Sequence, residues 1–404
     1  MATVLKDVEA PAHVPVDLIF DVDIYNLPGL EHGQTLDVHA LWKDVQDRHP
    51  RVFWTPRYGG HWIVSRYADI EKILLDHGTF SNAEPFIPKG VIPFQTPVQL
   101  DPPEHGPYRK LLMPAFMPAS LARATDRARA AAASIIEELQ PRGRCEFVKD
   151  FAGVMPIMAF LTLIDLPVED FAYLRSVAVE MSDPTNPNAA QAWTDMSNYV
   201  LRQIQLRRDE PRDDFITSIL SGQVAGRPLT DDEIFSMCLL IVGGGLDTVV
   251  SMTSLAASYL AQHPELRRMI AARPELLDNA VEEIARRFGT SNLGRLVRQD
   301  TEIAGAKMKA GDIVLCLFPL AGLDETVNDD PMTLNFERKR PKHLAFGTGP
   351  HTCIGNRLAK REIRIFLEEW FKRIPDFRLV EGCMPRVRTG IVNSVERLDL
   401  EWDV

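Results

Sequence analysis

The sequence has few cysteines and none of the cysteine patterns that mark a disulfide framework or a zinc site. Only five occur in 404 residues, and no two form a C-x-x-C pair: Cys145, Cys238, Cys316, Cys353 and Cys383. An odd number of cysteines in a chain of this length argues against disulfides formed in an oxidising compartment. We therefore expect reduced thiols and a cytoplasmic protein.

The sequence also lacks a leader, a basic surplus and a nucleotide-binding fingerprint. Residues 1–16 hold charged residues and prolines but no apolar core of signal-peptide length, and we expect no membrane anchor. The formal net charge of −11 disfavours nucleic acid as a partner, because no excess of lysine and arginine is available for phosphates. No glycine pattern typical of flavin or nicotinamide binding is visible.

What the chain does contain is a cysteine in a glycine-rich stretch, F-G-T-G-P-H-T-C-I-G, from Phe346 to Gly355. Glycine permits the sharp bends and close approaches that such a stretch requires. Beyond the cysteine, apolar residues recur at helical spacing: Ile354, Leu358, Phe366, Trp370 and Phe371. Cys353 is therefore expected at a helix N-terminus, where free N–H groups and the helix dipole favour a thiolate.

This stretch resembles the haem-binding signature of the cytochrome P450 monooxygenases, whose cysteine ligates haem iron as a thiolate. A lone cysteine after glycines is more often structural, but the match over the whole stretch reverses those odds. The resemblance implies haem b, Cys353 as the axial iron ligand and Phe346 packed beside the sulfur. It also implies the P450 fold, a triangular prism that is mainly α with a smaller β region. We expect one catalytic domain over residues 1–404, with β-rich parts near 50–65, 290–320 and 385–402.

A long apolar helix is predicted from Thr230 to Gln262. Thr230 and Glu233 form a capping box at its start, and the only formal charge between residues 234 and 261 is Asp247. A helix that is apolar on all sides is buried in a large protein or spans a membrane, and the soluble, acidic context favours a core helix of about 30 residues. Residues 243–245 are three consecutive glycines, each of which weakens a helix interior by about 1 kcal/mol.

We interpret these glycines as room for a flat cofactor against the helix backbone; a kinked helix with a satisfied aspartate is the alternative. The string G-G-L-D-T resembles the P450 motif (A/G)-G-x-(D/E)-T, whose acid and threonine manage proton delivery during oxygen activation. The resemblance gives Asp247 and Thr248 these catalytic roles.

Two further groups of residues follow from the same resemblance. The string D-P-P-E-H-x-x-x-R is similar to the segment that grips the haem propionates, which with two later positions gives four donors for two carboxylates: His105, Arg109, Arg295 and His351. Glu283 and Arg286 match the family's buried structural pair. The usual third member of that network is replaced by Thr333, and Arg338 is a candidate to take its place.

The electrons for such an enzyme must come from another protein. Between residues 338 and 364 eight basic residues face one acid, Glu362; they are Arg338, Lys339, Arg340, Lys342, Arg357, Lys360, Arg361 and Arg364. A charge run is usually just a solvated face, but this one surrounds the cysteine stretch. We expect it to dock an acidic 2Fe-2S ferredoxin, supplied by an NADH-dependent ferredoxin reductase. The protein itself is expected to be a monomer.

The segments L-I-V-G-G-G-L-D-T-V-V and A-G-L-D-E look like the camphor-hydroxylating bacterial branch of the family. That likeness implies the substrate-pocket residues Phe86, Leu240, Gly243, Ser291, Ile391 and Val392. Gly243 replaces a larger apolar residue, which predicts a larger site, and no tyrosine lies between Phe80 and Leu100 to bind a ketone. We therefore expect hydroxylation of a small apolar terpenoid, such as cineole, ionone or another monoterpenoid, rather than camphor. The alternatives are a haem-thiolate peroxygenase and a non-catalytic haem-binding sensor.

Overall fold

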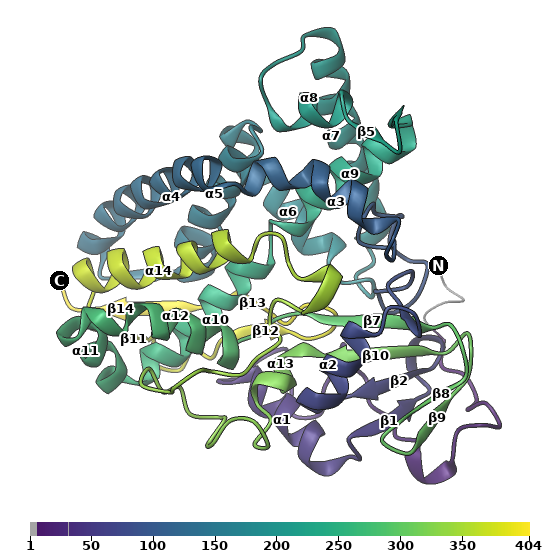
Figure 1. Cartoon of the computed structure of the whole chain (residues 1–404). Coiled ribbons are helices and arrows are strands. Elements are labelled where there is room, and N and C mark those ends of the chain that lie inside the picture. Colours follow the sequence, from purple (N-terminus) through teal and green to yellow (C-terminus); the bar gives the residue numbers. More distant parts are fainter. Residues whose placement is uncertain (1–5, 31) are drawn as a thin grey trace.

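The computed structural model describes residues 6–30 and 32–404, and most of these belong to helices (Figure 1). In chain order the α-helices are α1 (Val38–Arg48), α2 (Tyr67–Leu75), α3 (His105–Leu112), α4 (Pro118–Leu139), α5 (Met155–Leu163), α6 (Phe171–Met181), α7 (Ala189–Asp209), α8 (Phe215–Leu220), α9 (Asp231–Gly244), α10 (Thr248–Gln262), α11 (Pro264–Ala272), α12 (Leu277–Arg287), α13 (Phe318–Gly322) and α14 (Asn356–Arg373).

The strands form one larger sheet and several small ones. The five-stranded sheet has the order β1 (Val52–Thr55), β2 (His61–Val64), β10 (Ile313–Leu317), β7 (Asn292–Val297) and β3 (Phe80–Ser81). A second sheet joins β11 (Phe377–Leu379), β14 (Asp399–Trp402) and β4 (Arg144–Glu146). The remaining pairs are β12 (Arg386–Arg388) with β13 (Ser394–Arg397), β8 (Thr301–Ile303) with β9 (Ala306–Met308), and β5 (Gln223–Val224) with β6 (Arg227–Pro228).

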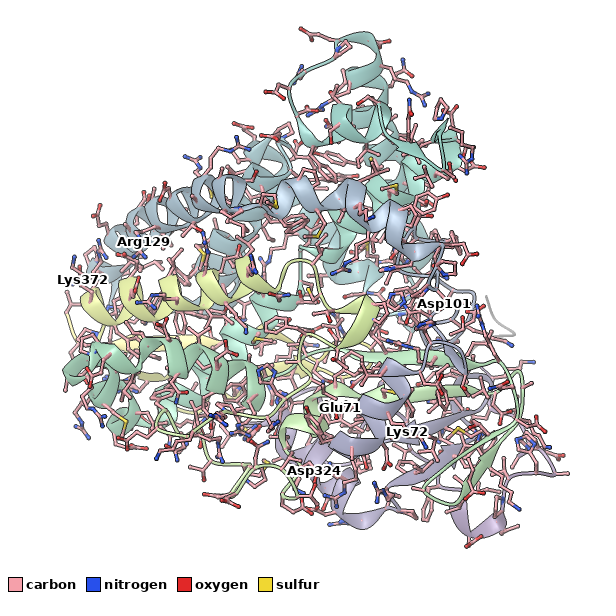
Figure 2. The ribbon with its side chains drawn as sticks, in the orientation of Figure 1. Glu71, Lys72, Asp101, Arg129, Asp324 and Lys372 are labelled. Atoms are coloured by element: carbon pink, nitrogen blue, oxygen red, sulfur yellow. The ribbon has the colours of Figure 1, made fainter. Side chains whose placement is uncertain are left out.

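The helices and the larger sheet occupy different parts of the molecule. Figure 1 shows the five-stranded sheet beside α1 and α2 at the lower right, while α4, α5 and α14 lie together at the left. Arg129 of α4 ties these helices by ion pairs to Glu368 and Glu369 of α14, at 2.6 and 2.5 Å (Figure 2). The predicted mainly α fold with a smaller β region is confirmed.

The central apolar segment differs from the prediction of one continuous helix and agrees with the alternative of a kinked one, because it forms two helices. The capping box at Thr230 is present, but α9 ends at Gly244 and α10 begins at Thr248. Between them the backbone leaves helical angles, with φ −98° and ψ 0° at Gly245 and φ −125° and ψ −33° at Asp247. A Cβ on Gly245 would lie 2.5 Å from the ring of Phe160, so a residue with a side chain could not occupy this break without displacing that ring.

The segment Asp231–Gln262 is long and apolar enough to cross a membrane. Much of it is buried against other parts of the chain, however, and α10 packs against β13, α12 and α14. This is the pattern of a core helix in a large protein.

Candidate active site

The cysteine stretch forms a bent loop that ends at the first turn of α14. The backbone N–H of Cys353 donates to the carbonyl oxygen of Phe346 at 2.8 Å, which closes the loop on itself. The thiol is accessible and lies close to Gly355, where a Cβ would be 3.8 Å from the sulfur. Beside the loop, the ammonium group of Lys360 lies 5.5 Å from the ring centre of Phe346.

The helix end was predicted to favour a thiolate at Cys353, but the surroundings taken together have the opposite effect. Although the residue is exposed, the protein atoms packed around the sulfur desolvate the thiol and raise its pKa, while the N–H groups of Gly355 and Asn356 and the charge of Arg109 lower it. The net shift is upward, so desolvation outweighs the helix end. A metal cation bound to the sulfur would stabilise the thiolate, because a thiol that coordinates a metal loses its proton.

The three glycines at the end of α9 have different neighbours. A Cβ on Gly243 would lie 3.0 Å from the Cε atom of Met181, and one on Gly245 would meet Phe160. A Cβ on Gly244 would have nothing within 4 Å. Gly244 therefore leaves open space beside the helix, whereas the notches at its two neighbours are filled by other side chains. The prediction that Gly243 enlarges the site is thus not met, because Met181 takes the space.

Asp247 lies in the break between α9 and α10, and its charge partners were not found in the sequence. Arg388 of β12 approaches its carboxylate at 3.5 Å, and the same guanidinium donates to Ser182 Oγ at 2.7 Å and to the carbonyl of Val179 at 2.9 Å. Burial raises the pKa of Asp247, and Arg388 and Arg175 oppose that shift. Neither arginine is near Asp247 in sequence, so no motif could have indicated them. Thr248 is the first residue of α10.

The four residues predicted to bind propionates converge in the structure. His105 of α3 and His351 of the cysteine stretch have ring centres 4.4 Å apart, and Arg109 donates to the carbonyl of Thr352 at 2.6 Å. Burial lowers the pKa of His351 to about 3, and the next causes are the positive charges of Arg295, His105 and Arg109. The Nε2 atom of His351 is buried without a partner among the described residues.

The two arginines of this cluster and the unpartnered nitrogen of His351 favour a bound anion, since buried cations are costly when they lack a carboxylate partner. Arg295 is buried, and its recorded hydrogen bond goes to the carbonyl of Gly294 at 2.7 Å. Two carboxylates would match the cluster by charge-assisted hydrogen bonds. In the described part of the chain, no three His, Cys, Asp or Glu side chains gather as metal ligands. A metal that brings most of its ligands within a cofactor fits this site, as haem iron does.

The predicted structural pair is fully buried and has a third member. Arg286 donates to both oxygens of Glu283 at 2.7 Å, and both side chains are 0% exposed. Arg338 donates to the same carboxylate at 3.0 Å and so stands where the family's usual arginine is absent. Arg286 also donates to the carbonyls of Gly322 and Pro331, at 2.8 and 2.6 Å, which fixes α12 against the segment that leads to the cysteine stretch.

The predicted pocket residues come from four segments, three of which are joined by backbone contacts. Ser291 and Val392 form an isolated bridge, and the N–H of Asn292 donates to the carbonyl of Ile391 at 2.9 Å. Gly294 of β7 donates to the carbonyl of Pro85, next to Phe86, at 2.7 Å. Leu240 lies on α9, one turn before Gly243. Farther along this loop, Asp101 accepts from Ser81 and Arg298 at 2.5 and 2.7 Å and anchors the approach to α3 (Figure 2).

The basic run contributes less free charge than its count predicts. Several members are already paired: Arg338 with Glu283, Lys360 with Glu282 at 2.6 Å, and Arg364 with Glu368 at 2.7 Å. Glu362 is itself buried. The exposed members without an ion pair to another described side chain are Lys339, Arg340, Lys342 and Arg357. Two exposed apolar residues lie close to the cysteine stretch. Leu75 approaches Gly349, and Met113 begins a turn whose Phe116 packs against Gly355.

Comparisons with known proteins agree with this arrangement. Residues 171–374 match the family model described as Cytochrome P450. The curated relative "Probable cytochrome P450 127A1" of Sinorhizobium fredii is 31% identical over 399 residues, which are 97% of this chain and 96% of the relative. The crystal structure of CYP101J2 superposes with a TM-score of 0.88 at 38% identity, covering 98% of this chain and 100% of that chain. The structure of CYP101C1 gives 0.87 at 34% identity, with the same coverage.

The chain belongs to the cytochrome P450 family. Within that family it is a bacterial P450 of the camphor-like branch, an oxygenase whose cofactor is haem b.

Proposed function

We propose that this protein hydroxylates a small apolar terpenoid, using O2 and electrons that an NADH-dependent reductase delivers through a 2Fe-2S ferredoxin. The observations that carry the proposal are an accessible cysteine, a cluster of four donors none of which is hydrogen-bonded to a carboxylate of the described residues, and a helix opened at Gly244. The pocket residues add mostly apolar surface, which favours a substrate with few polar groups. We further propose a monomer in the cytoplasm.

When bound, haem b would supply oxygen activation at an iron held by Cys353. His105, Arg109, Arg295 and His351 would hold its propionates, and Gly244 would let it lie against α9. Phe346 would cover the cysteine sulfur on the other side of the loop. The loop hydrogen bond and the close approach of the two histidine rings support these roles.

We assign proton delivery to Asp247 and Thr248. Because burial raises the pKa of Asp247, its carboxyl can hold a proton at a higher pH than an exposed aspartate can. Arg388 and Arg175 limit that shift and keep the group able to release the proton. A group used in general acid catalysis needs a pKa near the working pH, and these opposing influences move Asp247 in that direction.

The test of the proton pathway is Thr248→Ala in the holoenzyme with a reconstituted redox chain. We expect NADH consumption to continue, peroxide to appear and product per NADH to fall by about tenfold or more. Thr253→Ala, which removes a buried hydroxyl from the next turn of the same helix, serves as the control and should stay coupled. Equal product per NADH in Thr248→Ala and the wild type would refute the role.

The substrate class is tested by a spectral screen of the ferric holoenzyme with cineole, ionone and other monoterpenoids. A substrate that displaces iron-bound water moves the haem absorption band to shorter wavelength, so binding is read without turnover. We expect the compact terpenoids to give this shift and polar compounds of equal size not to. A screen in which polar compounds bind best would contradict the proposed class.

The electron donor is tested through the free cations of the basic run. Charge reversal at Arg357 and Lys342 should slow reduction by an acidic ferredoxin, and added salt should slow the wild type toward the same rate. Lys307→Glu, on β9 at the far end of the molecule from α14 in Figure 1, is the matched control. Reduction that ignores both salt and these substitutions would exclude an electrostatic docking site.

A further inference from the structure

Met181 is the last residue of α6 and fills the notch that Gly243 leaves in α9. The Cε atom of Met181 lies 3.0 Å from the place where a Cβ of Gly243 would be, and the Met181 side chain is buried, with 6% exposure. A contact this short leaves no room for even a methyl group unless the thioether moves. The two residues therefore fit together as one small and one large partner.

The end of α6 is held in this position by Arg388. Its guanidinium donates to the carbonyl of Val179 at 2.9 Å and to Ser182 Oγ at 2.7 Å, which are the residues on either side of the Met181 turn. The same group reaches the carboxylate of Asp247, four positions after Gly243. The backbone that carries Met181 is thus tied to the break between α9 and α10, so it cannot withdraw from Gly243 without disturbing this arginine, although the Met181 side chain can still change its rotamer.

Only one of the three glycines leaves open space. Gly245 faces the ring of Phe160 and Gly243 faces Met181, while a Cβ on Gly244 would meet nothing within 4 Å. The open space beside α9 is therefore limited to Gly244. The rigid ring of Phe160 lies against Gly245, and the flexible thioether of Met181 lies against Gly243. Methionine has three rotatable side-chain bonds and adapts to irregular gaps, so it yields more readily than phenylalanine.

We infer that Met181 is a specificity-determining residue, which closes the Gly243 notch and sets the largest substrate that the pocket admits. This inference rests on the proposed function in placing the substrate beside α9. It deepens that proposal by assigning the size limit to a contact between α6 and α9 rather than to the glycine alone.

The test is a double-substitution cycle with Met181→Ala and Gly243→Ala in the haem-loaded protein. Three iron-binding probes of increasing size, imidazole, 4-phenylimidazole and miconazole, report through the same absorption shift, so the dissociation constant is read without turnover. Met181→Ala should tighten miconazole binding by about tenfold or more, because several heavy atoms leave the pocket, and change imidazole binding less than about twofold. Gly243→Ala should weaken miconazole binding by about tenfold, since its methyl group displaces the thioether.

In the double variant, the new methyl group enters the space that the methionine has left. Gly243→Ala should therefore cost much less in the Met181→Ala background than in the wild type, and this non-additivity is the signature of direct contact. Met196→Ala, a buried methionine of α7, is the control for a general loosening of the core and should leave the size series unchanged.

Additive effects, or equal changes for all three probes, would overturn the inference. A loosened fold would instead alter the Met196→Ala control as well, and that result would also overturn it. Failure of the proposed function would look different, because the wild type would then bind no compact terpenoid even though the azole series still reported pocket size.

Discussion

The cysteine side of the site and its glycine side are held together in different ways. We use "cysteine side" for residues 346–355 with α12 and α14, and "glycine side" for the break between α9 and α10 with α6 and β12. On the cysteine side, Glu283 receives two arginines at 2.7 and 3.0 Å, and the pair with Arg286 is 0% exposed. On the glycine side, Asp247 has one arginine at 3.5 Å, contributed from 141 residues away.

The difference indicates that the cysteine side is built to be rigid and the glycine side to be adaptable. The cysteine side has short, bidentate contacts that fix a backbone loop, and such contacts add geometric precision as well as energy. The glycine side has a longer ion pair and a flexible methionine over a glycine, and it can rearrange at lower cost. A ligand loop needs the first property, and a pocket that admits substrate needs the second.

The strongest way to break the cysteine side is Glu283→Gln. The substitution leaves the charges of Arg286 and Arg338 buried without a carboxylate, and the loss of one partner of a buried pair costs about 3–5 kcal/mol. We expect the free energy of unfolding in urea to fall by that amount and haem loading to decrease.

Glu368→Gln is the matched control for Glu283→Gln. Its carboxylate pairs with Arg129 and Arg364 but is 22% exposed, so its removal should cost about 1 kcal/mol or less. Equal losses in the two variants would show that burial of the Glu283 network does not govern stability on this side.

Arg388→Met is the corresponding test of the glycine side. It removes hydrogen bonds from a charged group to Val179 and Ser182, which we expect to cost about 1–3 kcal/mol. It also removes a positive charge that lowers the pKa of Asp247. The carboxyl should then stay protonated to higher pH, so the alkaline limb of the product-per-NADH profile should move to higher pH.

Arg388→Lys, which keeps the charge but not the forked geometry, should restore part of the pH profile and little of the stability. A profile that is unchanged in Arg388→Met would mean that Arg388 supports only the fold.

The same contrast explains which features could be predicted from the sequence alone. The cysteine stretch, the pair at Glu283 and Arg286 and the alternating helical pattern of α14 are local, so spacing and resemblance indicated them. The role of Arg338 could also be predicted, because Thr333 stands where the family has an arginine and few nearby residues could replace that arginine. The break at Gly245–Asp247 was foreseen only as the alternative of a kinked helix with a satisfied aspartate, since three glycines are compatible with either a continuous or an interrupted helix.

The partners of Asp247 and Gly243 were beyond sequence reasoning for a physical reason. Arg388 and Met181 reach them from β12 and α6, and nothing in either segment distinguishes these residues from ordinary strand and helix positions. Tertiary contacts decide each of these cases.

A smaller effect on the cysteine side should appear with pH, through His39 of α1. Its Nε2 atom lies 2.7 Å from the carbonyl of Gly289, just beyond α12, and burial lowers the pKa of this histidine to about 4 from 6.5. The folded protein keeps the ring neutral, while the unfolded chain takes up a proton below pH 6.5. Stability is therefore fully present above that pH and is lost as pH falls toward 4, by about 1.4 kcal/mol per unit.

We expect His39→Gln to flatten this part of the stability profile, measured as the melting temperature between pH 7 and pH 5. His263→Gln, at a side chain that is 37% exposed, serves as the control for replacing a histidine at the surface. If both variants melt with the wild-type dependence on pH, acid sensitivity arises elsewhere.

The smallest expected effect tests whether the glycine side depends on how α9 begins, far from its broken end. Thr230 accepts from the N–H of Glu233, and the Glu233 carboxylate accepts from the N–H of Thr230 at 2.7 Å, so the capping box is complete. Thr230→Ala should lower the free energy of unfolding by about 1 kcal/mol, and Thr230→Ser should restore most of it. Because the cap lies three turns before Gly243, binding of the azole probes should not change. If Thr230→Ala did change which probe size binds best, α9 would have to move as one rigid unit. The adaptability assigned to the glycine side would then belong to the whole helix rather than to Met181.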